Sequence, residues 1–383
     1  MIEFKTLLQY IEILFTKTIK YKYNFKRPQT FNLKSYSVYY MVKTTTYFVI
    51  ISLMLAMNSV ILQSQDLVFS QFYAAPMQLN PGLTGVTNAP RLSFNYRNQW
   101  PTLPNAYTSY AASYDQFVEP LNSGFGVSII SDQAGDGIYV SNRISASYAY
   151  NMRIEEDVYL RGGLEAAVEQ KNLNWSKLIF LDQINPELGF TDEFGNPYPT
   201  SETAPGSSSQ LYPDFGAGLV LYSSKFYGGV NIRHINAPDE AWLADTEFAT
   251  LPVYYSVHGG AEISLSNPYN NGKKPAFISP NILFAKQGNF QQLNLGALLS
   301  MWYIYGGVWY RTTFSNSDAA IFSLGFQRSL FKIGYSYDWT ISGLSGRSGG
   351  AHEVSLILNF EETERFKRKR RGKQYNDCLK IFR

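Results

Sequence analysis

The sequence predicts an all-β protein, a transmembrane antiparallel up-and-down β-barrel of about 14 strands with an N-terminal periplasmic strap segment. Apolar and polar residues alternate with period two along most of the chain, and no helical pattern of comparable length follows Gln65. Aromatic residues make up 16% of the chain, the same share as charged residues. Strands of roughly ten residues with one apolar face are typical of barrels that cross a bilayer.

Residues 1–64 are predicted to form two segments that precede the folded protein. Residues 1–40 are basic and rich in Tyr, and we predict a disordered or wrongly assigned extension ahead of a better start at Met41. Residues 41–64 have a positive Lys43, an apolar core and a polar approach to a cleavage point near Ser64, which predicts a signal peptide. An uncleaved anchor helix is the alternative, although the apolar run is shorter than the roughly 20 residues that a spanning helix needs.

Residues 65–90 predict an ordered strap, although the sequence there shows no useful periodicity. Its central stretch reads FSQFYAAPMQLNPGLTG. Pro76 and Pro81 prevent it from adding a strand to the sheet, and Gly82 and Gly85 allow a sharp turn into the first strand. We expect this segment to pack against or inside the periplasmic end of the barrel.

The barrel itself is predicted over residues 91–360. In the stretch 91–97 one face carries Leu, Phe and Tyr while the other carries Arg, Ser and Asn, and the stretch 331–339 repeats this alternation. Fourteen such segments fit the even strand number of bacterial barrels. The predicted strands are 91–100, 107–117, 123–131, 139–151, 157–171, 212–223, 225–235, 253–265, 276–287, 290–300, 302–313, 319–328, 330–339 and 350–360.

The strand ends and connections support a membrane barrel over a soluble β-sandwich. Short turns at 223–224 and 327–329 suit the periplasmic side, whereas the longer connections 175–211 and 236–252 suit the cell exterior. Aromatic residues near strand ends predict an interfacial girdle. They are Trp100, Tyr150, Trp302, Trp309 and Trp339.

Charged residues on the expected lumen face predict ion pairs across the barrel interior, because an unpaired buried charge is costly. They include Arg91, Arg97, Arg161, Glu165, Glu169, Arg233 and Asp338. Lining a selective channel is the alternative. Residues 361–383 are too basic for a further strand and predict a solvated periplasmic tail.

Composition excludes several classes of function. Cys378 is the single cysteine, so a disulfide framework or a multi-cysteine metal site is ruled out. The positive charge collects at the two ends, and the residues between 43 and 361 hold 16 basic and 24 acidic side chains. Such an acidic body is a poor candidate for binding nucleic acid.

Short motifs give no catalytic, cofactor-binding or metal-binding residue. The stretch 346–350 matches the G-x-S-x-G pattern but is followed by a strand, and a nucleophile elbow needs a helix there. The stretch 132–137 resembles part of a calcium loop but has Ala at the third ligand position. The histidines His234, His258 and His352 are scattered, so we assign no catalytic, cofactor or metal residue and no cofactor.

Several short motifs stand at the start of the predicted mature chain, namely Gln65-Asp66, Phe69-Ser70-Gln71-Phe72, Asn80-Pro81-Gly82 with Gly85, and Tyr96-Arg97-Asn98-Gln99-Trp100. Together they resemble the PorP/SprF family of the type IX secretion system. Members begin with a Q-F-S-Q-Y segment, an N-P-A-x-x-G turn and a Y-R-x-Q-W first strand, and Phe72 here replaces the usual Tyr. The resemblance extends from about Gln65 to Phe360. Its motif residues, whose role is unknown, are Phe69, Ser70, Gln71, Asn80, Pro81, Gly85, Tyr96, Arg97, Gln99, Trp100, His352 and Glu353.

The resemblance implies a non-enzymatic barrel in the outer membrane of a Gram-negative bacterium. The implied partners are outer-membrane lipid, a secreted cargo protein with a C-terminal sorting domain, such as a large gliding adhesin, and the type IX translocon with its periplasmic ring and motor proteins. The implied role is assisting secretion or surface attachment of that cargo. A porin-like or substrate-specific channel and an outer-membrane lipid-modifying enzyme are the alternatives.

Overall fold

The computed structural model describes the barrel, the segment before it and the last residues of the chain. The described residues are 65–103, 106–187, 189–242, 250–265, 276–314, 317–343, 346, 348–363, 366 and 379–382. The predicted extension and signal peptide, residues 1–64, and most of the predicted tail lie outside these residues.

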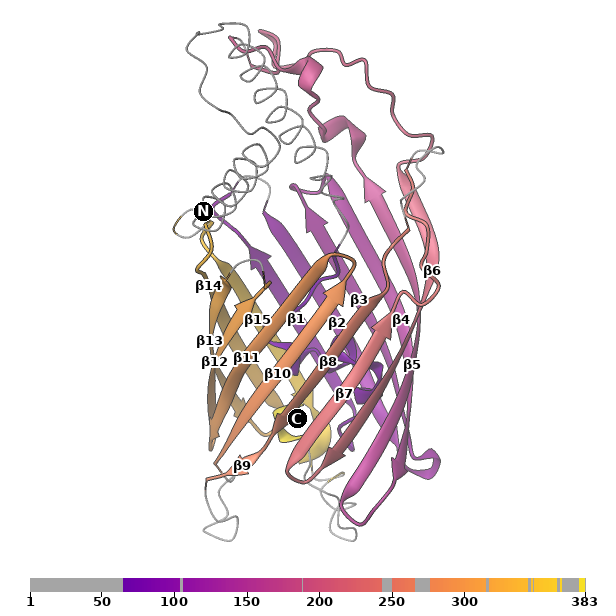
Figure 1. Cartoon of the computed structure of the whole chain (residues 1–383), viewed down its shortest axis with the longest axis vertical. Helices are drawn as coiled ribbons and strands as arrows, with labels where there is room; N and C mark the ends of the chain where they lie inside the picture. Colours follow the sequence, from indigo (N-terminus) through magenta and orange to yellow (C-terminus); the bar gives the residue numbers. More distant parts are fainter. Residues whose placement is uncertain are drawn as a thin grey trace, which may run out of the picture. The chain divides into compact units, whose positions relative to one another are not determined.

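The described strands form one antiparallel sheet that closes on itself (Figure 1). The strands are β1 (Arg91–Gln99), β2 (Tyr107–Val118), β3 (Ser123–Ala134), β4 (Tyr139–Arg153), β5 (Val158–Leu173), β6 (Ser209–Ser223), β7 (Phe226–Arg233), β8 (Tyr254–Ala261), β9 (Ile263–Ser264), β10 (Phe277–Gln287), β11 (Phe290–Met301), β12 (Ile304–Thr312), β13 (Ser317–Arg328), β14 (Phe331–Thr340) and β15 (Ala351–Asn359). β1 pairs with both β2 and β15, which closes the seam. Since β9 follows β8 along β10 and pairs with β10 alone, the wall has fourteen strands.

The alternation in the sequence becomes an alternation of inward and outward side chains. Along β14, Phe331, Ile333 and Tyr335 are about half exposed on the outer face, whereas Lys332 and Ser336 are buried. The predicted barrel is therefore confirmed, and each of the fourteen predicted strands overlaps an observed one. Among the described residues, no helix is both long and apolar enough to cross a membrane.

The two ends of the barrel differ in their connections, and we name them for this. At the turn end, where β1 begins, residues 224–225 join β6 to β7 and residues 329–330 join β13 to β14. At the loop end, residues 174–208 separate β5 from β6. The predicted alternation of lengths is incomplete, because the tight turn 288–289 lies at the loop end and the longer stretch 262–276 joins β8 to β10 at the turn end.

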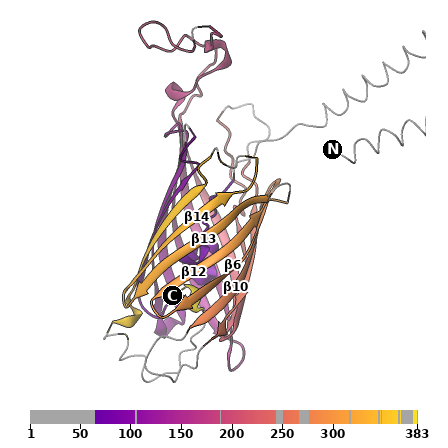
Figure 2. The same ribbon diagram turned by 90° about the vertical axis from the view of Figure 1, so that its left-hand side faces the viewer.

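The segment before β1, which we call the strap (residues 65–90), runs through the interior of the barrel (Figure 2). Its short helices are η1 (Phe72–Ala74), α3 (Pro76–Leu79) and η2 (Pro81–Leu83), and a proline opens each of the last two. Most strap residues are buried, as predicted for an ordered plug. The strap is not confined to one end of the barrel, however, because it also extends to Asp66, beside residues at the loop end.

The described end of the tail is also inside the barrel, at the turn end (Figures 1 and 2). Leu379, Ile381 and Phe382 are buried and belong to the same apolar cluster as Phe72 and Tyr73 of the strap. The prediction of a solvated tail is therefore wrong for these residues. The remaining short helices are η3 (Glu119–Leu121), η4 (Trp175–Lys177), η5 (Leu181–Gln183), η6 (Phe360–Glu362) and η7 (Lys380–Phe382).

Candidate functional site

The strap is held to the barrel wall by a buried carboxylate on β15. Both oxygens of Glu353 accept hydrogen bonds from the strap, one from the backbone N–H of Ser70 and one from that of Gln71, each at 2.8 Å. Arg97 on β1 donates to the same carboxylate at 3.1 Å. The side chains of Arg97 and Glu353 are almost fully buried, so the ion pair replaces the water that each charge gave up.

A second carboxylate completes this cluster. Asp338 on β14 accepts from Arg97 at 2.9 Å and from the Ser70 hydroxyl at 2.7 Å, and Arg311 on β12 lies 3.0 Å from it. The Gln71 amide donates to the backbone carbonyl of Glu353 and accepts from a serine of β15. Two cations and two carboxylates therefore enclose one hydroxyl of the strap.

Farther along the strap, Asn80 fixes the start of η2. Its side-chain oxygen accepts from the N–H of Gly82 at 2.8 Å, as an N-cap does. Its amide nitrogen donates to the carbonyl of Val230 at 2.9 Å and to that of Leu219 at 3.2 Å. A single side chain therefore shapes the turn and ties it to two strands.

The next turn of the strap approaches the wall closely. Arg161 on β5 donates to the carbonyl of Gly82 at 2.9 Å and also to that of Thr84. Gly85 has a φ of +67°, and its N–H donates to Asp115 at 2.7 Å. A Cβ on Gly124 of β3 would lie 2.0 Å from the Thr84 carbonyl oxygen, so this strand position requires glycine.

At the loop end the strap finishes in a charged cluster that the sequence did not reveal. Asp66 lies 2.9 Å from Nε2 of His234, and the other ring nitrogen lies 3.1 Å from Asp214 on β6. Burial alone would lower the pKa of His234, but the two carboxylates outweigh it and raise the pKa to about 9. Arg143 on β4 binds Asp214 and also Glu165, at 2.6 Å. His234 is therefore a cation at neutral pH and binds the strap electrostatically.

Aromatic residues of the strap pack in an apolar cluster with inward side chains of the wall. Tyr73 stacks on Trp309 with ring centroids 5.7 Å apart, and it meets Tyr305 edge-on at 6.1 Å. Phe72 packs edge-on against the same tryptophan at 6.2 Å. The prediction that Trp309 belongs to an outer aromatic girdle is therefore wrong, because its side chain points inward and is 2% exposed.

The structure brings together several of the motif residues and separates others. Phe69, Ser70, Gln71, Arg97 and Glu353 lie around one buried cluster, with Gln99 accepting from Arg97 at 3.2 Å. Asn80, Pro81 and Gly85 form the strap turns that contact β5, β6 and β2. Tyr96 faces outward against Tyr110, Trp100 donates its backbone N–H to Gly350, and His352 contacts the Tyr335 hydroxyl on the outer face.

The predicted lumen charges are paired or bound to the strap. Arg91 binds Asp115, the glutamates of β5 bind Arg143, and Arg161 binds strap carbonyls. Sequence reasoning missed Asp66, Asp115, Arg143 and Asp214. For those that lie on strands, the period-two alternation of the sequence shows that the side chains point inward. Which of them pair depends on the register between strands, and the sequence does not show that register.

The three histidines occupy three separate environments. His234 lies among carboxylates at the loop end, His258 faces the lumen beside Asn80, and His352 faces outward. Ser348 contacts Thr340 and the N–H of Gly350. Within the described part of the chain, no group of three or more His, Cys, Asp or Glu residues is arranged to hold a metal ion.

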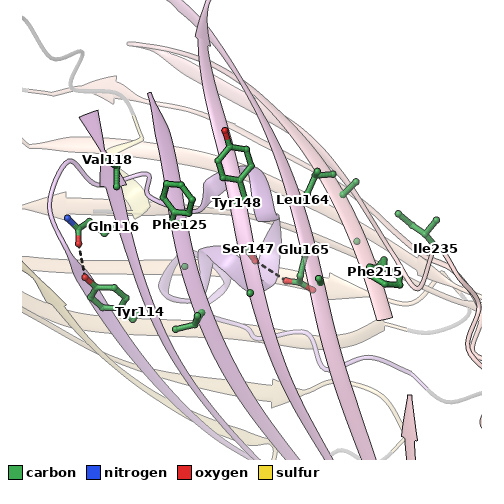
Figure 3. Close-up of a pocket in the computed structure, with 16 residues that line it drawn as sticks. Tyr114, Gln116, Val118, Phe125, Ser147, Tyr148, Leu164, Glu165, Phe215 and Ile235 are labelled. Atoms are coloured by element: carbon green, nitrogen blue, oxygen red, sulfur yellow. Dashed lines mark hydrogen bonds between the residues drawn. The ribbon is translucent and has the colours of Figure 1, made fainter. Parts of the chain in front are cut away.

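The outer wall carries an apolar groove of about 790 Å³ across β2 to β6 (Figure 3). Ala146 and Ala166 pair across β4 and β5 and leave a depression in the wall. Larger side chains border it, namely Tyr114, Phe125, Val127, Tyr148, Leu164 and Phe215. The groove faces away from the lumen, among the exposed apolar side chains of the wall.

The fold and its interior define a class, an outer-membrane-type β-barrel that holds its own N-terminal strap inside the lumen. The chain belongs to the family of type IX secretion system membrane proteins PorP/SprF, whose family model matches residues 61–358. This membership confirms the resemblance drawn from the strap and first-strand motifs, and it identifies a membrane protein associated with that secretion system. A search of curated proteins found no match.

Three of the solved structures that are similar to this chain have low sequence identity to it. A mutant of the TodX monoaromatic hydrocarbon channel has 10% identity and a TM-score of 0.41, with 75% of this chain and 94% of that chain covered. A Pseudomonas aeruginosa FadL homologue has 11% identity and a TM-score of 0.38, with 73% and 93% covered. BamA from Haemophilus ducreyi lacking POTRA domains 1–3 has 9% identity and a TM-score of 0.34, with 71% and 70% covered.

Proposed function

We propose that this protein is a non-enzymatic component of the type IX secretion system in the outer membrane of a Gram-negative bacterium, where it assists secretion or surface attachment of cargo. The observation that carries the proposal is the strap bound inside the lumen of a PorP/SprF barrel. The strap occupies the interior through buried ion pairs and aromatic packing, which suits a binding scaffold more than an open pore.

The loop end is the surface proposed to meet the secreted cargo protein with its C-terminal sorting domain, such as a large gliding adhesin. Residues 174–208 carry exposed apolar side chains, among them Leu181 at 90% and Phe194 at 88%. Exposed apolar residues of this size on a long loop are typical of protein contacts. The loop end would then face the cell exterior.

The opposite end is proposed to face the periplasm, where the translocon and the ring and motor proteins would meet it. The apolar outer wall would contact outer-membrane lipid, and the apolar groove over Ala146 and Ala166 would take an acyl chain. We also propose that residues 41–64 direct export and are removed, and that residues 1–40 are not part of the mature protein.

The test is surface display of type IX cargo in a strain that lacks the gene. We expect loss of at least one cargo from the cell surface, restored by the wild-type chain and not by a chain that carries Leu181→Asp and Phe194→Asp. Unchanged display of every cargo in the deletion strain would contradict the proposal.

A porin-like channel remains the second candidate because the fold is a barrel. The purified protein in a planar bilayer distinguishes the two. We expect no steady conductance from the wild-type barrel, and a steady current without any partner protein would favour the channel. A lipid-modifying enzyme would instead lose activity in a screen of His234, His258 and His352 substitutions.

A further inference from the structure

The last described residues of the chain occupy a defined place in the lumen at the turn end. Leu379, Ile381 and Phe382 are 5%, 2% and 0% exposed, as buried as the residues of the barrel core. The Phe382 ring meets Tyr227 of β7 edge-on, with centroids 5.2 Å apart. A chain terminus that follows a strongly basic stretch is thus packed as a core segment.

Two cations of the wall bind the backbone of this segment. Nη1 of Arg91 donates to the carbonyl of Phe382 at 2.9 Å, and Nζ of Lys332 donates to that of Ile381 at 3.0 Å. Arg91 is oriented by Asp115, which accepts from its Nε and Nη2 at 2.8 Å each. Asp115 thus holds two nitrogens of the Arg91 guanidinium, and Nη1 points at the tail. The orientation of Arg91 therefore does not depend on the tail.

The surface under the segment is apolar. The interior of a membrane barrel is ordinarily polar. At this level, however, the inward side chains include Val220, Tyr227, Phe277 and Leu283, all buried in one cluster with the tail and the strap. Such a surface is stable only when an apolar group covers it.

The segment can leave this surface without breaking the sheet. The described residues 379–382 make no strand pairing, and 19 residues separate Asn359, the end of β15, from Leu379. The strap, in contrast, continues directly into β1. Release of the tail from the lumen therefore breaks fewer contacts with the wall than release of the strap would.

We propose that the turn end of the lumen is a binding site for a short apolar peptide segment, with residues 379–382 as its resident and exchangeable occupant. Arg91 and Lys332 recognise two successive backbone carbonyls, and the apolar layer with Tyr227 receives the side chains. A partner protein that presents a similar apolar segment would displace the tail. Release of the tail would thereby signal that the partner has bound at the turn end.

The test uses the full chain with Ile381→Asp and Phe382→Asp, which empties the site while the tail remains attached. The probe is a fluorescent peptide with the sequence of residues 377–383, with Ser in place of Cys378. Fluorescence anisotropy in detergent should show at least tenfold tighter binding to this variant than to the wild-type chain, whose site is occupied. Adding Lys332→Met to the variant should weaken peptide binding at least threefold.

Matched controls separate the site from general stickiness. The same chemical change at two exposed apolar residues outside the strands, Phe314→Asp with Ile341→Asp, should leave peptide binding at the wild-type level. A peptide that carries the two aspartates should not bind the emptied variant. Equal binding of the probe to wild-type and emptied barrels, or no binding to an emptied barrel that still shows heat-modifiable migration, would overturn the proposal.

A second measurement needs no variant. Carboxypeptidase Y digestion of the folded wild-type barrel, followed by mass spectrometry, should remove Phe382 and Ile381 slowly. An excess of the unlabelled peptide should accelerate that removal at least fivefold, because it displaces the tail. Removal at an unchanged rate would show that the tail does not exchange.

Discussion

The two ends of the chain lie in the same lumen but are held there by different forces. The strap contributes backbone N–H groups and a hydroxyl to buried carboxylates that are paired with arginines. The tail contributes apolar side chains and two backbone carbonyls. Ionic clusters that are satisfied only when every member is present make the strap a fixed part of the barrel, whereas the tail is a docked segment.

The largest expected effect follows from Glu353→Ala. Arg97 would lose one buried partner, and the N–H groups of Ser70 and Gln71 would lose theirs. Breaking a buried ion pair on one side costs about 3–5 kcal/mol. Urea unfolding of the barrel in detergent should show this loss, and Glu156→Ala in an exposed turn is the control. Equal stability of the two variants would contradict a fixed strap.

The next effect concerns pH at the loop end. Binding to Asp66 and Asp214 raises the pKa of His234 from 6.5 to about 9, so its stabilising charge is fully present below pH 6.5 and is lost as the pH rises through 9. Arg143 and Arg233 are the cations that face the same carboxylates. Stability should therefore fall between pH 7 and 10, by at most about 2–3 kcal/mol.

The control for this pH dependence is His234→Asn, because the φ of +55° at this position suits Asn. The variant should be less stable at pH 6.5 and should show a flatter pH profile. A wild-type slope that survives in the variant would mean that another group carries it.

A smaller effect is expected from Asn80→Ala, which removes the cap of η2 and two hydrogen bonds to strand carbonyls. The loss should be about 1–3 kcal/mol, the cost of leaving buried polar groups unsatisfied. The same unfolding measurement with Asn196→Ala in the exposed loop should show a much smaller change. If the two match, the strap turn is not held by Asn80.

The smallest effect is predicted for the tail. Phe382→Ala removes a buried ring, which in a rigid core would cost about 3–5 kcal/mol. Here the loss cannot exceed the free energy of docking the tail, because the tail can leave while the barrel stays folded. We therefore expect a change below that of Asn80→Ala in urea unfolding. A loss as large as that of Glu353→Ala would place the tail among the fixed parts.

The barrel was predictable because an alternation with period two shows which side chains of a strand point inward and which point outward. The same alternation placed Arg97 and Asp338 inside. The girdle prediction for Trp309 rested on its position near a strand end. Trp309 lies four residues after the inward-facing Tyr305, so the period-two alternation places its side chain inside as well. That alternation alone would have corrected the prediction.

The tail and the loop-end cluster were not predictable from one sequence. The apolar residues at 379, 381 and 382 follow a basic stretch and form too short a run to show any period. Asp66 and His234 are 168 residues apart, so their contact depends on the path of the strap through the closed barrel. Such contacts need the register between strands, which no local pattern contains.

The seam of the barrel has a consequence for assembly. Arg97 and Glu353 are register partners across β1 and β15, the two strands that meet last in chain order, and both bind Ser70 of the strap. If β1 paired with β15 without the strap, Glu353 would be buried without the two hydrogen bonds that its carboxylate accepts from the strap. Insertion of the strap and pairing of β1 with β15 are therefore one cooperative step. A closed barrel without the strap in its lumen is disfavoured during assembly.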